Sequence, residues 1–160
     1  MWYNGSTLRS RRGESLPVRE FLVRLVEQVR ALLPEERRSF QTYSRWSLVK
    51  LYYGSLAIHY EAWVQRKTGR LELGLHFEGA AEQNQGLLEA LGQRASEIVA
   101  GLGPQVEMEQ WTKSWTRVHQ SLPLGPLDEE LLHVAAQRLA QMITVLQPIL
   151  EEVSSQPKLS

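Results

Sequence analysis

Apolar residues recur every three to four positions in three stretches of the chain, and this spacing predicts three helices. They cover about 15–33, 80–102 and 127–148. Acidic residues crowd the first turn of the third helix, where they match the positive end of the helix dipole. Pro34 ends the first helix, and Pro148 is expected to kink or end the third because proline removes a backbone donor.

Runs of aromatic and β-branched residues predict strands in two further stretches. The segment 46–78 is interrupted by Gly54-Ser55 and by 66–69, and both interruptions have hairpin length. The predicted strands are 46–53, 56–65, 70–78, 105–111 and 115–121. The polar, basic residues 35–45 are expected to form a connection. The fold class is therefore α+β, with a mainly antiparallel five-stranded sheet and three helices in the order α-β-β-β-α-β-β-α.

Side chains alternate between the two faces of a strand, so register decides which residues share a face. Directing Tyr60 and Leu75 into the core pairs 60 with 75, 58 with 77, 62 with 73 and 64 with 71. His59 then lies opposite His76 on the other face. A two-residue turn at Gly54-Ser55 would pair 51 with 58 and 49 with 60. The same face then also carries Trp46, Leu48, Tyr52 and Trp63.

The length of 160 residues suits one domain, which we expect to span 15–153, between a flexible basic tail (1–14) and a frayed C-terminus (154–160). The chain has no cysteine, which excludes disulfides, thiolate metal sites and cysteine catalysis. It also lacks a secretory signal pattern and a membrane-spanning apolar run, so a cytoplasmic location without membrane contact is expected. Net charge is zero, but residues 1–70 carry 13 Lys/Arg against 6 Asp/Glu.

The order and length of the elements between 16 and 150 resemble the type III secretion chaperone-like fold. That resemblance implies a homodimer that binds a partner chain. The segment from Leu73 to Leu122 also resembles an uncharacterised domain found beside some prokaryotic restriction-type proteins. This second likeness rests on Leu75, Phe77 and Glu78, the helix Leu87–Ile98, Gly101–Gly103, and Glu109 with Trp111.

An aromatic sheet face rimmed by charged groups is typical of an interface, although a helix of the same chain could equally cover it. The leading functional prediction is therefore a non-enzymatic protein-binding or adaptor module, without a cofactor, that binds a protein partner or a second copy of itself. The predicted binding face consists of Trp46, Leu48, Tyr52, Trp63, His59 and His76.

Two alternatives stay open. The first is a nucleic-acid-associated accessory domain whose basic contacts are Arg9, Arg11, Arg12, Arg37, Arg38 and Arg45. The second is a metal-dependent enzyme around His59 and His76. Imidazoles on adjacent strands can share a metal ion, and Glu61 or Glu78 could complete its coordination shell. The residues form no metal-binding motif and Lys50 would oppose a cation, so the sequence favours a titrating surface pair and no metal.

Overall fold

Residues 14–155, the part of the chain that this computed structural model describes, form six antiparallel strands and four α-helices. The strands are β1 (Gln41–Arg45), β2 (Leu48–Tyr52), β3 (Ile58–Gln65), β4 (Arg70–Phe77), β5 (Glu107–Gln110) and β6 (Thr116–Pro123). The helices are α1 (Val18–Leu32), the 3-10 turn η2 (Glu35–Arg37), α2 (Ala81–Gly92), α3 (Ala95–Leu102) and α4 (Glu129–Ser155). The α+β class and the antiparallel sheet are confirmed, whereas the predicted numbers of strands and helices are wrong.

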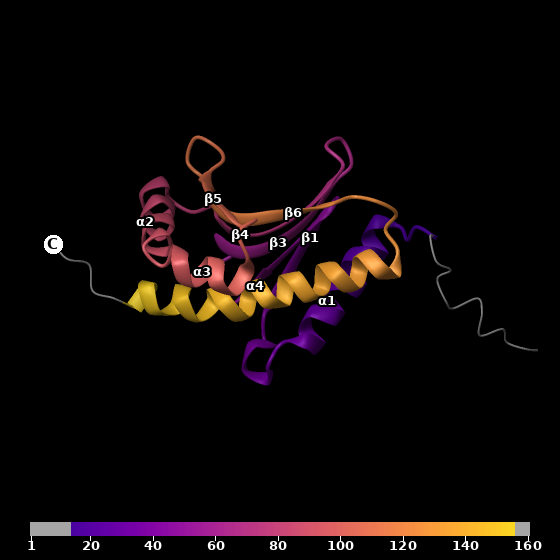
Figure 1. The fold of residues 1–160 in the computed structure, drawn as a ribbon, viewed down its shortest axis with the longest axis horizontal. Helices are drawn as coiled ribbons and strands as arrows, with labels where there is room; N and C mark the ends of the chain where they lie inside the picture. The colour runs from indigo at the N-terminus through magenta and orange to yellow at the C-terminus, as the bar shows by residue number, and fades with distance from the viewer. Residues whose placement is uncertain (1–13, 156–160) are drawn as a thin grey trace, which may run out of the picture.

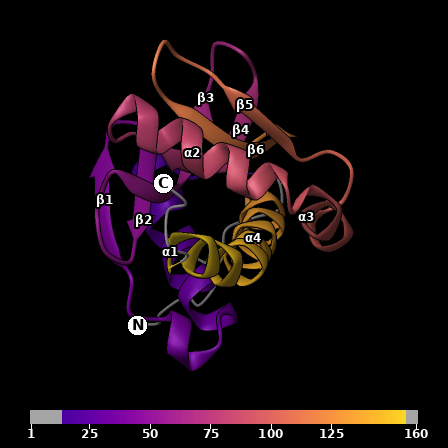
Figure 2. The ribbon, with the colours of Figure 1, turned by 90° about the vertical axis from the view of Figure 1, so that its left-hand side faces the viewer.

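The sheet has the order β1-β2-β3-β4-β6-β5, and helices cover one of its faces (Figure 1). Helix α4 runs along β3 and β4 with α1 packed beside it, and Figure 2 shows α4 end-on beneath the sheet. The inner side chains of the central strands are buried here: Tyr60, Ala62, Val64, Leu71, Leu73, Leu75 and Phe77. They pack against the apolar side of α4, including Leu139, Met142, Ile143 and Leu146. We call the opposite face, away from α1 and α4, the outer face.

Two helix predictions are corrected by the structure. The predicted helix 80–102 is divided into α2 and α3, and the break follows Gly92, a poor helix former. Leu91 on α2 and Ile98 on α3 are both buried in the core. Helix α4 continues through Pro148 to Ser155. Because Ile149 and Leu150 are buried beyond the proline, packing keeps the last turns helical.

The predicted connection 35–45 contains strand β1, whose five side chains are all exposed and so carry no apolar alternation. The β3–β4 register is confirmed, including His59 opposite His76. The β2–β3 register is wrong by two residues: the loop between these strands is longer than Gly54-Ser55, and Val49 pairs with Ala62. A shift of two leaves every side chain on its predicted face. The predicted tail 1–14 lies outside the described residues except for Glu14, as do residues 156–160 of the predicted frayed C-terminus.

Candidate metal centre on the outer face of the sheet

Two histidines lie side by side at the centre of the outer face. His59 on β3 and His76 on β4 are directly paired, and their rings stack with centroids 5.5 Å apart at an interplanar angle of 24°. Both side chains have an exposed fraction of 0%. Because both rings are buried, their nitrogens need hydrogen-bond partners within the protein.

The first histidine has one nitrogen held by the backbone. His59 Nδ1 lies 2.8 Å from the carbonyl oxygen of Leu56. Because a carbonyl oxygen only accepts hydrogen bonds, we infer that Nδ1 carries a proton. The lone pair of a neutral ring is then on Nε2, which lies 3.1 Å from Glu61 Oε1 and 3.8 Å from Glu78 Oε2.

The second histidine has the complementary arrangement. His76 Nε2 lies 2.9 Å from Glu72 Oε1, to which it donates, and Nδ1 lies 3.3 Å from Glu78 Oε2. A carboxylate behind a metal-binding histidine fixes its tautomer and ring orientation, and raises its basicity as a ligand. His76 Nε2 also lies 3.8 Å from Glu61 Oε2, so a carboxylate of the site faces each nitrogen of this ring. A proton held on His59 Nδ1 and on His76 Nε2 would leave the other nitrogen of each ring for an ion.

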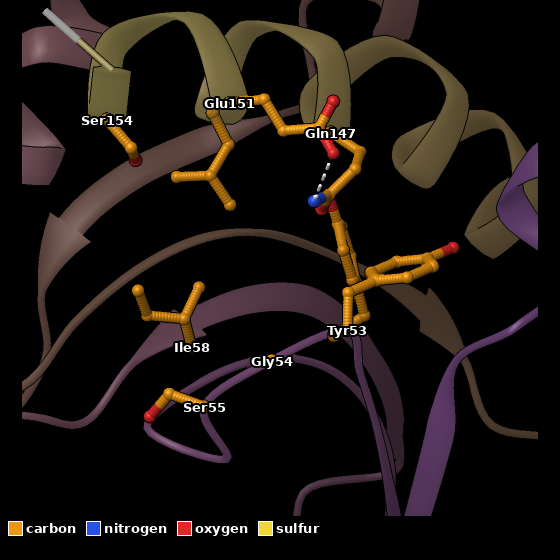
Figure 3. A pocket seen from close by; sticks show the side chains of 9 residues that line it. Tyr53, Gly54, Ser55, Ile58, Gln147, Glu151 and Ser154 are labelled. Atoms are coloured by element: carbon orange, nitrogen blue, oxygen red, sulfur yellow. Dashed lines mark hydrogen bonds between the residues drawn. The ribbon is translucent and has the colours of Figure 1, made fainter.

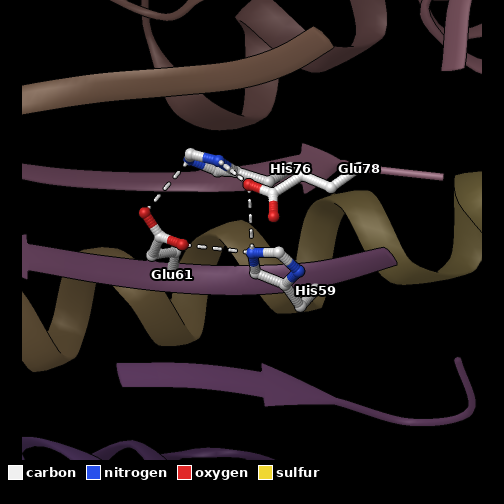
Figure 4. Close-up of side chains that lie close together, drawn as sticks. All are labelled: His59, Glu61, His76 and Glu78. Carbon is white, nitrogen blue, oxygen red and sulfur yellow. Dashed lines mark hydrogen bonds and ion pairs between the residues drawn. The ribbon is translucent and has the colours of Figure 1, made fainter. Parts of the chain in front are cut away.

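Four donor atoms therefore converge, one each from His59, Glu61, His76 and Glu78, and all lie within 4.8 Å of one another. Figure 4 shows these side chains, which we call the His–Glu cluster, pointing toward a shared space. Donors around tetrahedral zinc, at about 2.0–2.1 Å from the ion, are separated by about 3.3–3.4 Å. Three of the six donor separations are 3.1, 3.3 and 3.8 Å, and the largest is at most 4.8 Å, so the side chains would draw together around an ion.

Charge also favours a cation in the cluster. The buried or half-buried Glu61, Glu72 and Glu78 carry three negative charges, and Lys50 pairs with Glu78. Arg117 lies 3.7 Å from Glu72 and is shared with Glu109, from which it is 2.7 Å away. Lys50 Nζ lies 3.2 Å from Glu78 Oε1, the oxygen that does not contact the histidines. With both imidazoles neutral, the four carboxylates (Glu109 included) and the two cations leave two negative charges, which one divalent ion would match.

The pKa values show how strongly the carboxylates attract positive charge. Burial lowers the pKa of His76, but hydrogen bonds with Glu72 and Glu78 outweigh burial and raise that pKa to about 10. Burial raises the pKa of Glu78, but the hydrogen bond with His76 and the charges of His59 and Lys50 bring it down to about 2. An ion would therefore bind by displacing a proton from His76, as metal ions do from their ligands.

An aromatic loop covers the cluster. The ring of Trp111 meets His76 edge-on at 5.5 Å and lies 6.4 Å from Trp63 and 5.9 Å from Trp115. Arg117 stacks on the same indole, with its guanidinium carbon 4.7 Å from the ring centroid. Because Trp111 packs on His76 and both histidines are buried, the cluster is closed to solvent.

A second group of possible ligands, Glu107, Glu109 and His119, lies on β5 and β6. Arg117 donates to Glu109 over 2.7 and 3.0 Å, and this hydrogen bond lowers the pKa of Glu109. Burial and the charge of Arg117 lower the pKa of His119. Because a guanidinium already occupies the carboxylate and would repel an ion, this group suits a cation less well than the His–Glu cluster.

The predicted binding face is divided by the structure. Trp46 is 83% exposed, and Leu48, Tyr52 and Trp63 are half-buried. His59 and His76 share this face but are fully buried, so they belong to the cluster rather than to an accessible surface. Glu61 joins them, as the alternative metal prediction placed it.

The predicted basic contacts are also dispersed. Arg37 forms a two-point ion pair with Glu151, and Arg38 donates to the carbonyl oxygen of Leu33. Arg45 stacks on Trp46 at 4.1 Å. Arg9, Arg11 and Arg12 lie outside the described residues.

Glu72 and Trp111 belong to the site but were not predicted as parts of it. The signal for Glu72 is the alternation 72, 74, 76 and 78, which puts it on the same face as His76. The position of Trp111 carries no comparable signal, because a loop places it.

A different kind of hollow lies on the helical side of the sheet (Figure 3). It has a volume of about 190 Å³ and is lined by residues of the β2–β3 loop, β3 and α4, among them Tyr53, Ile58 and Gln147. Tyr60 Oη donates to Gln147 Oε1 over 3.0 Å at its edge. It offers no cluster of metal-binding donors among the described residues and lies across the sheet from the His–Glu cluster.

Comparisons with protein-family models, with curated proteins and with solved structures find no match. The two resemblances stated from the sequence therefore stay expectations. Within residues 14–155, none of the helices combines the length and apolar character needed to cross a bilayer.

Proposed function

We propose that this protein binds one divalent transition-metal ion through the two histidines and two glutamates of the His–Glu cluster, with zinc as the best fit. The carrying observation is the pair of outward contacts, His59 Nδ1 to Leu56 O and His76 Nε2 to Glu72 Oε1. They leave His59 Nε2 facing Glu61 and Glu78, and His76 Nδ1 facing Glu78. Imidazole and carboxylate donors in tetrahedral array suit zinc.

The ion would have a structural role. Four protein donors fill a tetrahedral shell, whereas a catalytic zinc site keeps one position for water or substrate. The donors come from β3, β4 and the residue after β4, so the ion would join neighbouring strands on the face that no helix covers. Without the ion, the negatively charged carboxylates of Glu61, Glu72 and Glu78 lie close together at the centre of the sheet. This supports a metal-stabilised domain and weakens the prediction that the histidines contact a protein partner.

Metal analysis of the purified protein tests the proposal. We expect about one equivalent of zinc per chain, and we expect the protein freed of metal by a chelator to take up Co²⁺ with the visible absorption of a tetrahedral site. His76→Gln should lose both properties. His133→Gln is the matched control, because His133 is exposed on α4 and should leave them unchanged.

A folded, metal-free wild-type protein that fails to bind Zn²⁺ in calorimetric titration would contradict the proposal. So would a His76→Gln protein that binds zinc as tightly as wild type. If His76→Gln does not fold, as circular dichroism would show, the titration of the metal-free wild-type chain still decides the question.

A further inference from the structure

Two hairpin turns lie side by side at one end of the sheet, outside the His–Glu cluster. The β1–β2 turn consists of Trp46 and Ser47, and the β3–β4 turn covers 66–69. The backbone N–H of Val64 donates to Ser47 O over 2.9 Å, which ties the two hairpins together. A hollow of about 380 Å³ lies between them and includes Ser47, Trp63, Gln65, Arg66, Lys67 and Thr68 in its lining. We call this region the hairpin end.

An unusual tryptophan lies at the tip of the first turn. Trp46 is 83% exposed, and its backbone has a φ of 51°, the left-handed region that favours glycine and asparagine. Trp46 is therefore a large apolar side chain that is neither buried nor in a favourable backbone conformation. Observed strain of this kind points toward a functional role. The guanidinium of Arg45 stacks on the indole at 4.1 Å.

The hairpin end is positively charged. Arg45, Arg66, Lys67 and Arg70 are all exposed, and none forms an ion pair with a carboxylate of residues 14–155. The segments 43–48 and 63–71 contain no aspartate or glutamate. Tyr43 on strand β1 provides a second aromatic ring, which is 41% exposed. Exposed cations without a carboxylate partner and an exposed tryptophan thus lie at the same end of the sheet.

We propose that the hairpin end binds single-stranded nucleic acid. Exposed aromatic rings stack on the faces of unpaired bases, and the surrounding guanidinium and ammonium groups contact phosphates. In a duplex these base faces are already stacked, so the arrangement favours a single strand. The proposal uses no residue of the His–Glu cluster and does not depend on a bound metal ion.

Fluorescence anisotropy with a labelled oligothymidylate is the direct test. We expect binding that weakens with salt; four phosphate contacts correspond to a slope of about −2.8 in log K against log salt. Trp46→Ala should weaken binding about 5- to 150-fold, the range for one lost base stack. The double variant Arg66→Gln/Lys67→Gln should bring the slope to about −1.4.

The controls change similar residues elsewhere. Arg19→Gln removes an exposed arginine on α1, and Leu32→Ala removes an apolar side chain that is 48% exposed. Both should bind as wild type does. The proposal is wrong if oligothymidylate does not bind at low salt, if the hairpin-end variants bind no worse than the controls, or if a duplex binds more tightly than the single strand. Equal binding of polyglutamate would also overturn it, because charge alone would then explain the affinity.

Discussion

Glu72→Gln isolates the part of the proposed metal centre that never touches the ion. Glu72 is 1% exposed and accepts the hydrogen bond of His76 Nε2 at 2.9 Å. Glutamine keeps the shape and leaves an oxygen acceptor, but it removes the negative charge that favours an electron-rich imidazole. Loss of such a supporting group costs about 10- to 100-fold in metal affinity, or about 1.4–2.8 kcal/mol.

The assay is a competition titration of Zn²⁺ between the protein and a coloured chelator of known affinity. Glu107→Gln is the matched control, because the side chain of Glu107 lies on the same face but is 69% exposed. It should leave the dissociation constant unchanged. A folded Glu72→Gln protein with wild-type zinc affinity would refute the argument that Glu72 orients His76 for the ion.

Three further predictions concern the fold. Leu75→Ala, at a side chain with no exposure, should lower the free energy of unfolding by about 2–5 kcal/mol in a urea titration; a loss below about 1 kcal/mol would show that the core closes around the cavity. Arg37→Gln removes the ion pair with Glu151 and should cost at most about 1 kcal/mol, since Glu151 is half exposed. Burial raises the pKa of Tyr53 to about 12, and its hydroxyl donates to Arg37 O over 2.7 Å. Because the unfolded tyrosine ionises near pH 10, stability should fall as pH rises from about 10 to 12, and Tyr53→Phe should make that fall smaller in alkaline unfolding titrations.

Side-chain alternation along the chain was enough to predict the central hairpin, β3 and β4. Tyr60 and Leu75 lie on apolar faces of period two, so only one parity of pairing buries both, and that parity put His59 opposite His76. The same parity kept Leu48 and Trp63 on the outer face even though the β2–β3 register was wrong by two residues. Periodicity determines which face of the sheet a side chain occupies, but it does not determine the register between two strands.

Other elements and contacts have no local signal in the sequence and depend on packing between distant segments. Strand β1 is exposed along its length and exists through its pairing with β2, and Pro148 stays within α4 because the residues after it are buried. The burial of His59 and His76 likewise depends on distant groups. The Trp111 loop covers the cluster, the Leu56 carbonyl holds one ring, and Glu72 holds the other. Alternation along the strands brought the histidines together, but the nitrogens that face the centre were fixed by contacts made only in the folded chain.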